Sequence, residues 1–580
     1  MSEKLINITA FILLGVMFIM GFLSYREDSA TMDELSHIPA GFSYVSQQDF
    51  RINPEHPPLI KDLAALPLLL LNLNFPSQSL AWQEGINNQW FYGWEFLYNS
   101  GNNPDQILLL ARLPMLLVLV FLGAFLFWWT KKEFGKKVAL LVLILFVFSP
   151  TLLAHGRLVT TDVGATLGFV LGLYFWLKFL KKPSLKNIFW AGLIFGIAMC
   201  FKFSVVLLIP FFAFITVVYV LLHKKNLFRY LGLSVLIGII GALFIILPLY
   251  QLHVANYPVP RQLADTINLL ESSPMKQLKG LCVWMADKPI LRSLGHYLLG
   301  LLMATQRTAF GNTVYFMGMI SAAGWWYYFP IVYFLKTPLA LSILTLMALL
   351  LTAGFVEKPF WANPIKRVQE WLKGHFTEFS MLVFLAIYWA TSIAGNLNIG
   401  VRHVLPVLPF TYILVSLGLI LGIGKIKRAP LRKGAWALAF LLLFWYAGSS
   451  IRSFPHFLSH FNELGGGLDN GYQYAVDSNY DWGQDLKRLA LWVKDNNIEK
   501  IKVDYFGGGD VNYYLGQKGE KISSYSGPHE GWIAVSVTLL QGGMGNPVPG
   551  FDQPAGFYKW LAQYQPKARA GKSIFIYYIE

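Results

Sequence analysis

Long apolar runs decide what this chain can fold into. A run of about 20 apolar residues is long enough to cross a bilayer as a helix, and lipid offers no hydrogen-bond partner to open backbone. A β-barrel would instead show alternating segments of about ten residues. Eleven candidate spans lie at 6–23, 108–130, 138–155, 163–180, 188–201, 203–222, 228–250, 328–354, 377–396, 403–424 and 435–452. The sequence therefore predicts an all-α polytopic membrane protein with about eleven transmembrane helices, in which the short fifth run can form one bent unit with the sixth.

Charge placement predicts the orientation of these spans. Only 14% of the 580 residues are charged, whereas a soluble domain carries about 25%. The formal net charge of +15 is concentrated in the short loops 131–137, 181–187, 223–229, 357–376 and 425–433. Basic short loops mark the cytoplasmic side and contact anionic lipids. We expect a multi-pass protein of the cytoplasmic (inner) membrane with a cytoplasmic N-terminus and an extracytoplasmic C-terminal domain, and no nucleic-acid partner.

This topology places three long segments outside the membrane. They are the loops 24–107 and 251–327 and the tail 453–580. The first span has no clear small-x-small cleavage site, so we interpret it as an anchor rather than a removed signal. The chain is thus expected to hold a membrane domain at 1–452 and an extracytoplasmic domain at 453–580.

The tail resembles a small α/β domain. Residues 481–496 have an amphipathic helical pattern, and the runs 501–506, 532–540 and 573–580 are rich in β-branched and aromatic residues typical of strands. The polar stretch 461–483 is interpreted as a linker from the last span. The GGGD sequence at 507–510 is interpreted as a turn, because no phosphate-binding Lys-Ser or Lys-Thr pair follows it.

Two aromatic runs and two cysteines lie near the outer face. The runs 81–96 and 324–329 suit interfacial helices with Trp and Tyr at headgroup depth, or a platform for a lipid or sugar ring. Cys200 and Cys282 are able to pair in an oxidising compartment, but two unpaired residues are the favoured alternative.

Candidate chemistry begins directly after the first span. Asp33 and Glu34 are adjacent carboxylates within about ten residues of it. Their structural alternative is the start of a helix after Thr31, where acids are favoured. The Glu34-x-x-His37 spacing also permits a metal site, but without a second ligand pair this is a weak signal.

A second group follows in the same loop. Glu55 and His56 precede a Pro-Pro pair, which stiffens the backbone that presents them, and Lys61 comes soon after. We interpret these three residues as substrate-binding candidates.

Isolated cations surround the acids on the outer face. Asp162 and Arg157 lie in the short loop after the third span, Lys202 in an apolar hairpin, Arg402 and His403 before the tenth span, and Lys336 in an apolar run. A charge in the hydrocarbon region costs roughly 2.5–3.5 kcal/mol, so such residues usually face a polar cavity. For Lys336, snorkelling to the interface is the main alternative.

Acids beside isolated cations at a membrane surface suit a lipid-linked phosphate substrate. The cations hold the phosphate as it leaves, and a carboxylate takes a proton from an attacking hydroxyl. We therefore interpret Arg157, Lys202, Arg402, His403 and Lys336 as phosphate-binding candidates, and Asp33, Glu34 and Asp162 as catalytic candidates. An ATP-driven mechanism is disfavoured because the chain has no Walker motif.

Several motifs resemble the GT-C superfamily of polyprenyl-phosphate-dependent glycosyltransferases, in the branch of the protein O-mannosyltransferases and the lipid A aminoarabinose transferases. They are TMDELSHIPAGFSYV, FRINPEHPPLIKDLAALPLLL, HGRLVTTD, AGLIFGIAMCFKFS and NLNIGVRHVLPVLPF. The resemblance covers about residues 1–452, and the DSNYDWGQDLKRL stretch of the tail resembles uncharacterised bacterial members.

The resemblance implies roles for individual residues. Asp33 matches the first acid of the family's Asp-Glu pair, which positions and deprotonates the acceptor; Glu34 matches its neighbour, and Asp162 matches the acid of the second outer loop. His56 stands where the aminoarabinose transferases have a lysine before Pro-Pro. The family is inverting and generally works without a metal, so neither a metal nor another cofactor is expected. The tail lacks the tandem loop domains of eukaryotic protein mannosyltransferases, so a protein acceptor is not implied.

The leading hypothesis is therefore an enzyme that transfers one sugar from a polyprenyl-phosphate donor to an acceptor hydroxyl on the outer face of the membrane. The acceptor, a glycan, lipid or protein, stays open. The alternative is a transporter or flippase for a lipid-linked glycan, which would be expected to show paired repeats with broken helices. A non-catalytic scaffold whose tail binds cell-wall material is a third hypothesis.

Overall fold

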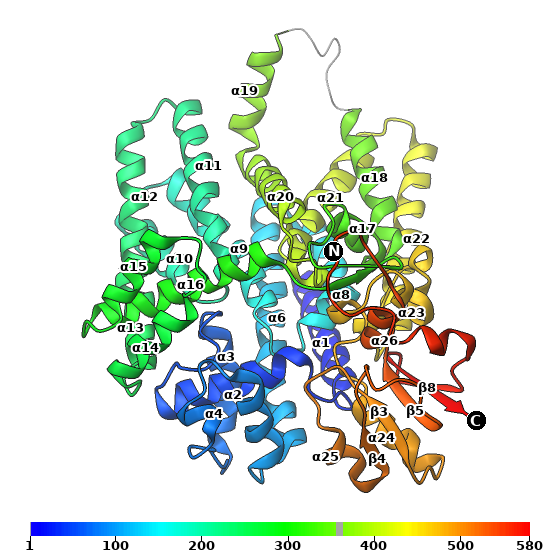
Figure 1. Ribbon diagram of the computed structural model, residues 1–580. Helices are drawn as coiled ribbons and strands as arrows, with labels where there is room; N and C mark the ends of the chain where they lie inside the picture. The colour runs from blue at the N-terminus through cyan, green and yellow to red at the C-terminus, as the bar shows by residue number, and fades with distance from the viewer. Residues whose placement is uncertain (1, 355–362) are drawn as a thin grey trace.

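A bundle of long helices forms most of the molecule. The computed structural model describes residues 2–354 and 363–580. Figure 1 shows the strands of the tail gathered with several short helices at one end of the bundle, while α19 (Pro364–Gly374) projects from the opposite end. The expected fold class, an all-α membrane part with a small C-terminal α/β unit, is confirmed.

Helices occupy all eleven predicted windows, but not all of them are full spans. Within the described ranges, eight helices are long and apolar enough to cross a membrane, and a ninth arises if α17 (Tyr328–Lys336) and α18 (Leu339–Ala353), which meet at a 106° bend, form one span. The eight are α1 (Glu3–Ser24), α6 (Pro104–Phe134), α9 (Asp162–Lys181), α11 with its preceding turn (Phe203–Leu222), α12 to α13 (Leu227–His253), α20 (Phe376–Ala394), α21 (Val407–Gly424) and α22 (Ala429–Arg452).

The two remaining windows hold shorter helices. The window 138–155 is divided into α7 (Lys136–Val147) and α8 (Pro150–His155). The break follows from the sequence, because the Ser149 hydroxyl caps α8 and Pro150 occupies its first position. The window 188–201 holds α10 (Leu185–Met199), which has 15 residues.

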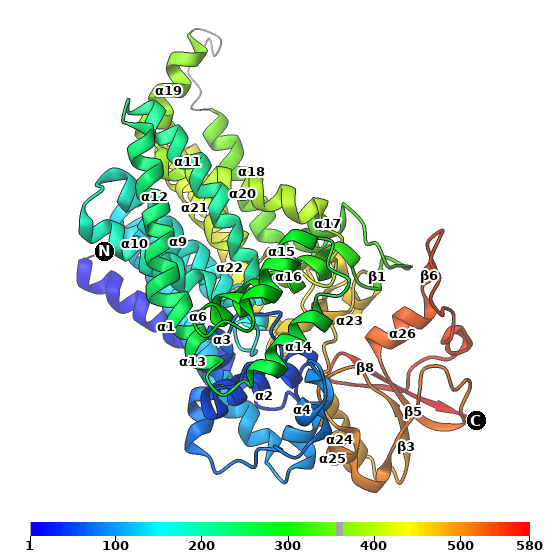
Figure 2. The same cartoon turned by 60° about the vertical axis from the view of Figure 1, so that its left-hand side comes forward.

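The two long loops and the tail gather at one end of the bundle. Their helices are α2 (Met32–Gln47), α3 (Leu59–Ala65), α4 (Leu80–Gln83), α5 (Gln89–Trp94), α14 (Val259–Leu269), α15 (Lys276–Met285) and α16 (Leu291–Phe310). Figure 2 shows the tail, coloured orange to red, next to the first loop, coloured blue. His296 Nε2 lies 3.1 Å from the Phe50 carbonyl oxygen, and Trp94 Nε1 donates to Asp510 Oδ2 at 2.8 Å. The three segments predicted to share one side of the membrane therefore contact one another.

The two aromatic runs differ from single interfacial helices. The run 81–96 contains α4, α5 and the beginning of a π-helical turn (Glu95–Asn99), and Asn87 between the two helices has a positive φ of 47°. The run 324–329 is a turn that leads into α17. Both cysteines are buried and unpaired.

The tail contains a five-stranded sheet with the order β4-β3-β5-β8-β7. Its strands are β3 (Ile501–Asp504), β4 (Gly519–Lys521), β5 (Gly531–Ser536), β7 (Ala568–Ala570) and β8 (Ile574–Ile579), accompanied by α23 (Gly467–Asn470), α24 (Leu486–Asp495), α25 (Val511–Leu515) and α26 (Val537–Met544). A second sheet joins β1 (Val314–Phe316) and β2 (Met319–Ser321) of the second loop to β6 (Asn546–Pro547) of the tail.

Two predicted elements of the tail have different boundaries. The run 532–540 forms a strand only as far as Ser536 and continues as α26, whose backbone Thr538 N–H donates to Asp481 Oδ2 at 2.9 Å. The helix predicted at 481–496 begins at Leu486. Asp481 is engaged by α26 and is thus unavailable for a helix start.

The stretch 461–483 is not an exposed linker. Lys336 Nζ donates to the Asn479 carbonyl at 2.6 Å, and Asn462 Nδ2 donates to the Thr337 carbonyl at 3.0 Å. The two ends of the stretch thus exchange hydrogen bonds with the membrane part, as buried polar groups must. The exposed residues between these ends are Glu463, Leu464, Asp469, Asn470 and Gln473.

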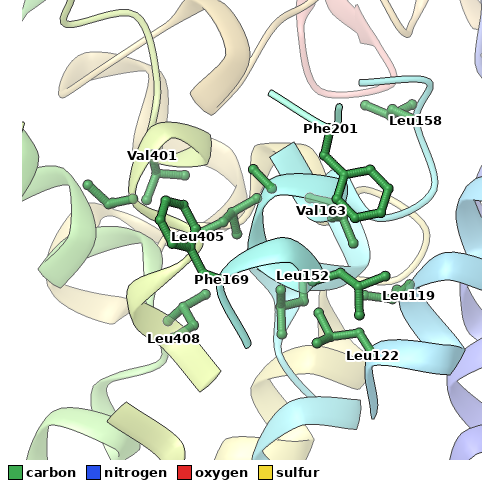
Figure 3. Close-up of a cluster of buried hydrophobic side chains, with 14 of the residues drawn as sticks. Leu119, Leu122, Leu152, Leu158, Val163, Phe169, Phe201, Val401, Leu405 and Leu408 are labelled. Carbon is green, nitrogen blue, oxygen red and sulfur yellow. The ribbon is translucent and has the colours of Figure 1, made fainter. Parts of the chain in front are cut away.

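A common apolar core underlies the loops before α9 and α21. Figure 3 shows this cluster, which includes Leu119, Leu122, Leu152, Leu158, Val163, Phe169, Phe201, Val401, Leu405 and Leu408. In a bilayer, close packing rather than removal from water stabilises such contacts. The two loops are therefore fixed relative to each other by one packed cluster.

Candidate functional site

The first turn of α2 separates the two adjacent acids. The helix starts after Thr31, as the structural alternative for these acids predicted. Glu34 Oε2 accepts hydrogen bonds from the Thr31 N–H and from the Thr31 hydroxyl, each at 3.0 Å. Glu34 also forms a buried ion pair with Arg112 at 2.6 Å. Burial acts to raise the pKa of Glu34, but the charge of Arg112 outweighs it and holds the pKa below its usual value. Glu34 thus holds the start of α2 in place, whereas the Asp33 side chain does not share these contacts.

The loop before α9 is tied to α2. The Val159 N–H donates to Glu34 Oε1 at 3.1 Å, and His37 Nδ1 lies 2.9 Å from the Val159 carbonyl oxygen. These two contacts bring Asp162, the first residue of α9, close to the Asp33 turn. Glu34 and His37 therefore have protein partners of their own.

A cavity of about 580 Å³ lies between these loops and α16. Six of the residues predicted from the sequence line it: Asp33, Glu55, His56, Lys202, Arg402 and His403. Other polar lining residues are Ser36, His37, Asn53, Trp90, Thr161, Ser204, Thr305, Arg307, Thr308 and Asn396. The cavity thus collects candidates from four distant parts of the chain.

A network of alternating charges forms one wall. Arg402 Nη1 lies 2.5 Å from Asp33 Oδ2 and 3.5 Å from Asp162 Oδ2, and Lys202 Nζ lies 2.5 Å from Asp162 Oδ1. The Asp162 side chain is only 1% exposed and does not line the cavity, whereas that of Asp33 is 16% exposed and does. Asp162 therefore holds the two cations from behind, and of the two acids in this network Asp33 is the one accessible from the cavity.

The network sets the protonation of Asp33. Burial acts to raise its pKa, but the charge of Arg402 and its hydrogen bond, with a smaller effect from Arg307, hold the pKa of this carboxyl below its usual value. Burial acts to lower the pKa of Arg402, but Asp33 and Asp162 raise it above its usual value. Asp33 is consequently ionised and Arg402 charged at neutral pH.

The histidines of the cavity are neutral. Burial, followed by the charge of Lys61, holds the pKa of His56 well below its usual value. Burial also lowers the pKa of His37, although the charge of Asp33 acts in the opposite direction. Neither imidazole contributes positive charge to the cavity at neutral pH.

Two lining residues carry unused donor or acceptor atoms. Among the residues that the structure describes, Arg402 Nε and His403 Nε2 are buried without a hydrogen-bond partner. Buried polar atoms are nearly always paired. The charged wall therefore retains capacity to bind a polar group.

Apolar side chains also line the cavity. They are Phe203, Val206, Leu207, Leu301, Ala304, Ala309, Ala394, Leu397 and Ile399. The cavity lining is thus amphiphilic, because it combines charged and hydrocarbon side chains.

Three predicted cations lie outside the cavity lining. Arg157 pairs with Asp28 at 2.8 Å, and Lys336 Nζ donates to the carbonyl oxygens of Leu458 and Asn479 at 2.8 and 2.6 Å. Lys61 Nζ donates to the His56 carbonyl at 2.9 Å, and it also donates to Asn53 and Tyr44. These buried cations have protein partners and do not line the cavity.

Three further residues of the site region were not predicted from the sequence. Arg307 lines the cavity and lies 3.2 Å from Glu55 Oε1, Arg112 partners Glu34, and Trp482 lies under the guanidinium of Arg402 with a 4.2 Å separation. Arg112 could have been identified from the sequence, because a charged residue inside an apolar run needs a partner. Arg307 and Trp482 come from segments whose placement depends on tertiary contacts. In the described part of the chain, no group of three or more His, Cys, Asp or Glu residues is arranged to hold a metal ion.

Comparison with protein families supports the sequence resemblance. Residues 101–250 match the family model described as dolichyl-phosphate-mannose-protein mannosyltransferase. The matched range contains Asp162 and Lys202 but neither Asp33 nor Arg402. The match supports the resemblance over these residues. No curated protein matches the chain.

Solved structures with a similar arrangement are distant in sequence. The chain is 12% identical to ArnT from Cupriavidus metallidurans bound to undecaprenyl phosphate, with 98% of this chain and 97% of that chain covered and a TM-score of 0.46. It is 10% identical to the Archaeoglobus fulgidus oligosaccharyltransferase in complex with Zn and sulfate, with 90% and 68% covered and a TM-score of 0.44. It is 10% identical to the arabinofuranosyltransferase AftD from Mycobacteria, with 100% of this chain and 40% of that chain covered and a TM-score of 0.38.

Proposed function

We propose that this multi-pass membrane protein of the GT-C glycosyltransferase type transfers one sugar from a polyprenyl-phosphate donor to an acceptor hydroxyl, with inversion at the anomeric carbon. The family match supports a glycosyltransferase. The donor class is inferred from the cavity lining, the stereochemistry from the family resemblance, and the side of the membrane from the basic short loops. The reaction would take place on the outer face of the cytoplasmic membrane.

The amphiphilic cavity is the observation that carries this proposal. A polyprenyl-phosphate sugar combines a hydrocarbon chain, a charged phosphate and a polar ring. The cavity lining offers apolar side chains such as Phe203 and Leu301, the charged side chains of Arg402 and Lys202, and polar side chains such as Asn53. Ligand sites of this kind are typically concave, largely apolar and furnished with a few convergent polar groups.

Lys202 and Arg402 are proposed to bind the donor phosphate. Both line the cavity, and Asp162 fixes them through contacts of 2.5 and 3.5 Å. A fixed guanidinium and ammonium stabilise the negative charge that grows on the phosphate as the glycosidic C–O bond breaks. Arg307, which is 43% exposed, is a third cation near the cavity and pairs with Glu55.

Asp33 is proposed to act as the general base. The acceptor oxygen attacks the anomeric carbon, the bond from that carbon to the phosphate oxygen breaks, and the hydroxyl proton passes to the Asp33 carboxylate. The electron pair of the broken bond leaves with the polyprenyl phosphate. A carboxylate can accept the proton only when ionised, and the low pKa of Asp33 provides this state.

Glu55, His56 and Asn53 are proposed to contact the sugar or acceptor hydroxyls. Gln89 Nε2 and Arg307 Nη1 both lie within hydrogen-bond distance of Glu55 Oε1, at 3.1 and 3.2 Å. Lys61 contacts the carbonyl of His56 and the side chain of Asn53 and therefore fixes this wall from behind.

The proposal is tested with purified protein and a panel of undecaprenyl-phosphate sugars. Release of undecaprenyl phosphate together with a glycosylated or hydrolysed product supports it, and Asp33→Asn must abolish this release. Asp49→Asn is the matched control, because Asp49 is buried in the same loop and pairs with Arg51 but does not line the cavity. Movement of an intact donor across vesicle bilayers without bond cleavage would instead establish a flippase.

A further inference from the structure

We infer that Trp482, a residue of the tail, is a positioning residue that holds Arg402 against Asp33 and Asp162. The Arg402 guanidinium carbon lies 4.2 Å from the centroid of the Trp482 ring, and Trp482 is 1% exposed. A cation over an indole face is attracted by the ring quadrupole, most strongly where water is excluded. The inference deepens the proposed function and rests on it for its kinetic consequences.

Trp482 contacts both sides of the Asp33–Arg402 pair. Its ring supports Arg402, while its carbonyl oxygen accepts a hydrogen bond from the Met32 N–H at 3.0 Å. Met32 directly precedes Asp33 at the start of α2. One residue of the tail therefore fixes the arginine through its side chain and the acid's helix through its backbone.

The residues before Trp482 fix the loop that carries Arg402. Ser478 Oγ donates to the Ile399 carbonyl at 2.7 Å, and Asn479 Oδ1 accepts from the Val401 N–H at 2.8 Å. The approach at Gly400 is so close that an added Cβ would lie 2.1 Å from Ser478 Oγ. The Arg402 loop therefore has its conformation imposed by the tail.

The residues after Trp482 fix the Asp33 loop in the same way. The Ser29 N–H donates to the Gln484 carbonyl at 3.0 Å, and the Ser29 hydroxyl donates to the Gly483 carbonyl at 2.7 Å. The Gly508 N–H donates to the Ala30 carbonyl at 3.0 Å. Segment 478–484 is thus a clamp between two active-site loops.

The clamp matters because the guanidinium has few other restraints. Its Nη1 atom contacts both acids, and its Nε has no hydrogen-bond partner among the described residues. The ring of Trp482 supplies a planar surface for the guanidinium. Without it, we expect Arg402 to leave the geometry that binds phosphate and keeps Asp33 ionised.

The test compares three variants. Trp482→Phe keeps an aromatic face, whereas Trp482→Leu keeps apolar bulk but removes the aromatic face. Trp129→Leu is the control for the loss of an equally buried tryptophan, since Trp129 is 1% exposed and does not line the cavity. We expect Trp482→Leu to lower kcat about tenfold with little change in the acceptor KM, and Trp482→Phe to restore most of it. Trp129→Leu should leave the kcat of the folded fraction unchanged.

The acid limb of the pH–rate profile separates positioning from a merely structural role. Asp33 is faced by Arg402, His37 and Arg307, with Asp477 as a further acid nearby. When Arg402 is no longer held, burial dominates and the acid limb of kcat moves to higher pH in Trp482→Leu, but not in Trp129→Leu. Wild-type kcat together with an unshifted acid limb in Trp482→Leu would overturn the inference.

A spectroscopic readout does not depend on activity or on the folding of a Trp482 variant. Stacking on the indole shifts the Nε–H proton signal of Arg402 upfield in ¹⁵N-arginine-labelled protein, and Arg402→Lys identifies the signal by removing it. An upfield-shifted Arg402 signal in the wild type supports the inference even if no sugar is transferred. In that case only the proposed function fails. A signal at the ordinary position overturns the inference.

Discussion

Arg402 Nη1 lies 2.5 Å from Asp33 Oδ2, although 369 positions separate the two residues in the chain. The proposed phosphate ligand and the proposed base are therefore one electrostatic unit. The guanidinium lowers the pKa of the carboxyl, and the carboxyl raises that of the guanidinium. A change to either residue should affect both donor binding and proton transfer.

Asp33→Asn should lower turnover by about 10²–10⁴-fold, the usual contribution of general-base catalysis. The amide keeps the shape of the side chain but cannot accept the acceptor's proton. The donor KM should change far less, and single-turnover measurements with saturating donor check both values. Near-normal transfer by Asp33→Asn, together with complete loss in Asp162→Asn, would assign the base to the loop before α9.

Lys202→Ala should raise the donor KM about tenfold or more, because a charge-assisted contact contributes roughly 1.5–3 kcal/mol. Steady-state kinetics at varied donor concentration measure the effect. Lys288→Ala serves as the control, since Lys288 is an exposed cation on the outer-loop segment and does not line the cavity. An unchanged donor KM in both Lys202→Ala and Arg402→Ala would place the phosphate elsewhere.

Glu34→Gln should reduce stability more than chemistry. Removing one partner of a buried ion pair typically costs about 3–5 kcal/mol, because the other charge stays buried without its counterion. Arg112 is 1% exposed and would be left in this state. The thermal unfolding midpoint should fall clearly, while the kcat of the remaining folded protein stays well above that of Asp33→Asn. A kcat loss equal to that of Asp33→Asn at unchanged stability would give Glu34 a direct catalytic role.

Asp481 should make stability depend on pH. Burial raises the pKa of this carboxyl from 3.8 to about 7. Between these values the folded protein holds a proton that the unfolded chain releases, so the free energy of unfolding falls as the pH rises and levels off above about pH 7. Thermal midpoints at pH 4–8 should therefore fall less steeply with pH in Asp481→Asn than in the wild type; identical slopes would refute the assignment.

The orientation is testable at Ser526, an exposed residue of the tail. A Ser526→Cys variant should react with a membrane-impermeant maleimide in intact spheroplasts. Background labelling should be low because Cys200 and Cys282 are both buried. Labelling that requires lysis would place the tail, and with it the cavity, on the cytoplasmic side.

The membrane part was largely predictable from local sequence. Helices occupy the apolar windows, because hydropathy alone dictates them. The boundary errors arise where polar residues serve distant partners. Asp481 looked like part of a helix but engages the start of α26 instead, and that contact depends on the fold rather than on neighbouring residues.

The site could be predicted only in part, as two lysines illustrate. Lys202 and Lys336 each appear as a lone cation in an apolar stretch. Lys202 pairs with Asp162 at the cavity, whereas Lys336 is bound by two backbone carbonyl oxygens away from it. Their local sequences do not distinguish these positions, because the partners come from elsewhere in the chain.

The clamp formed by segment 478–484 also imposes an order of events during synthesis. Asp33 and Arg402 leave the ribosome before Trp482, and a nascent chain that ends between Arg402 and Trp482 lacks the ring that contacts the guanidinium. Such a chain already holds every residue that lines the cavity, but its Arg402 guanidinium lacks the aromatic support. Truncated products should therefore consume lipid-linked sugar more slowly than chains whose translation has passed the clamp.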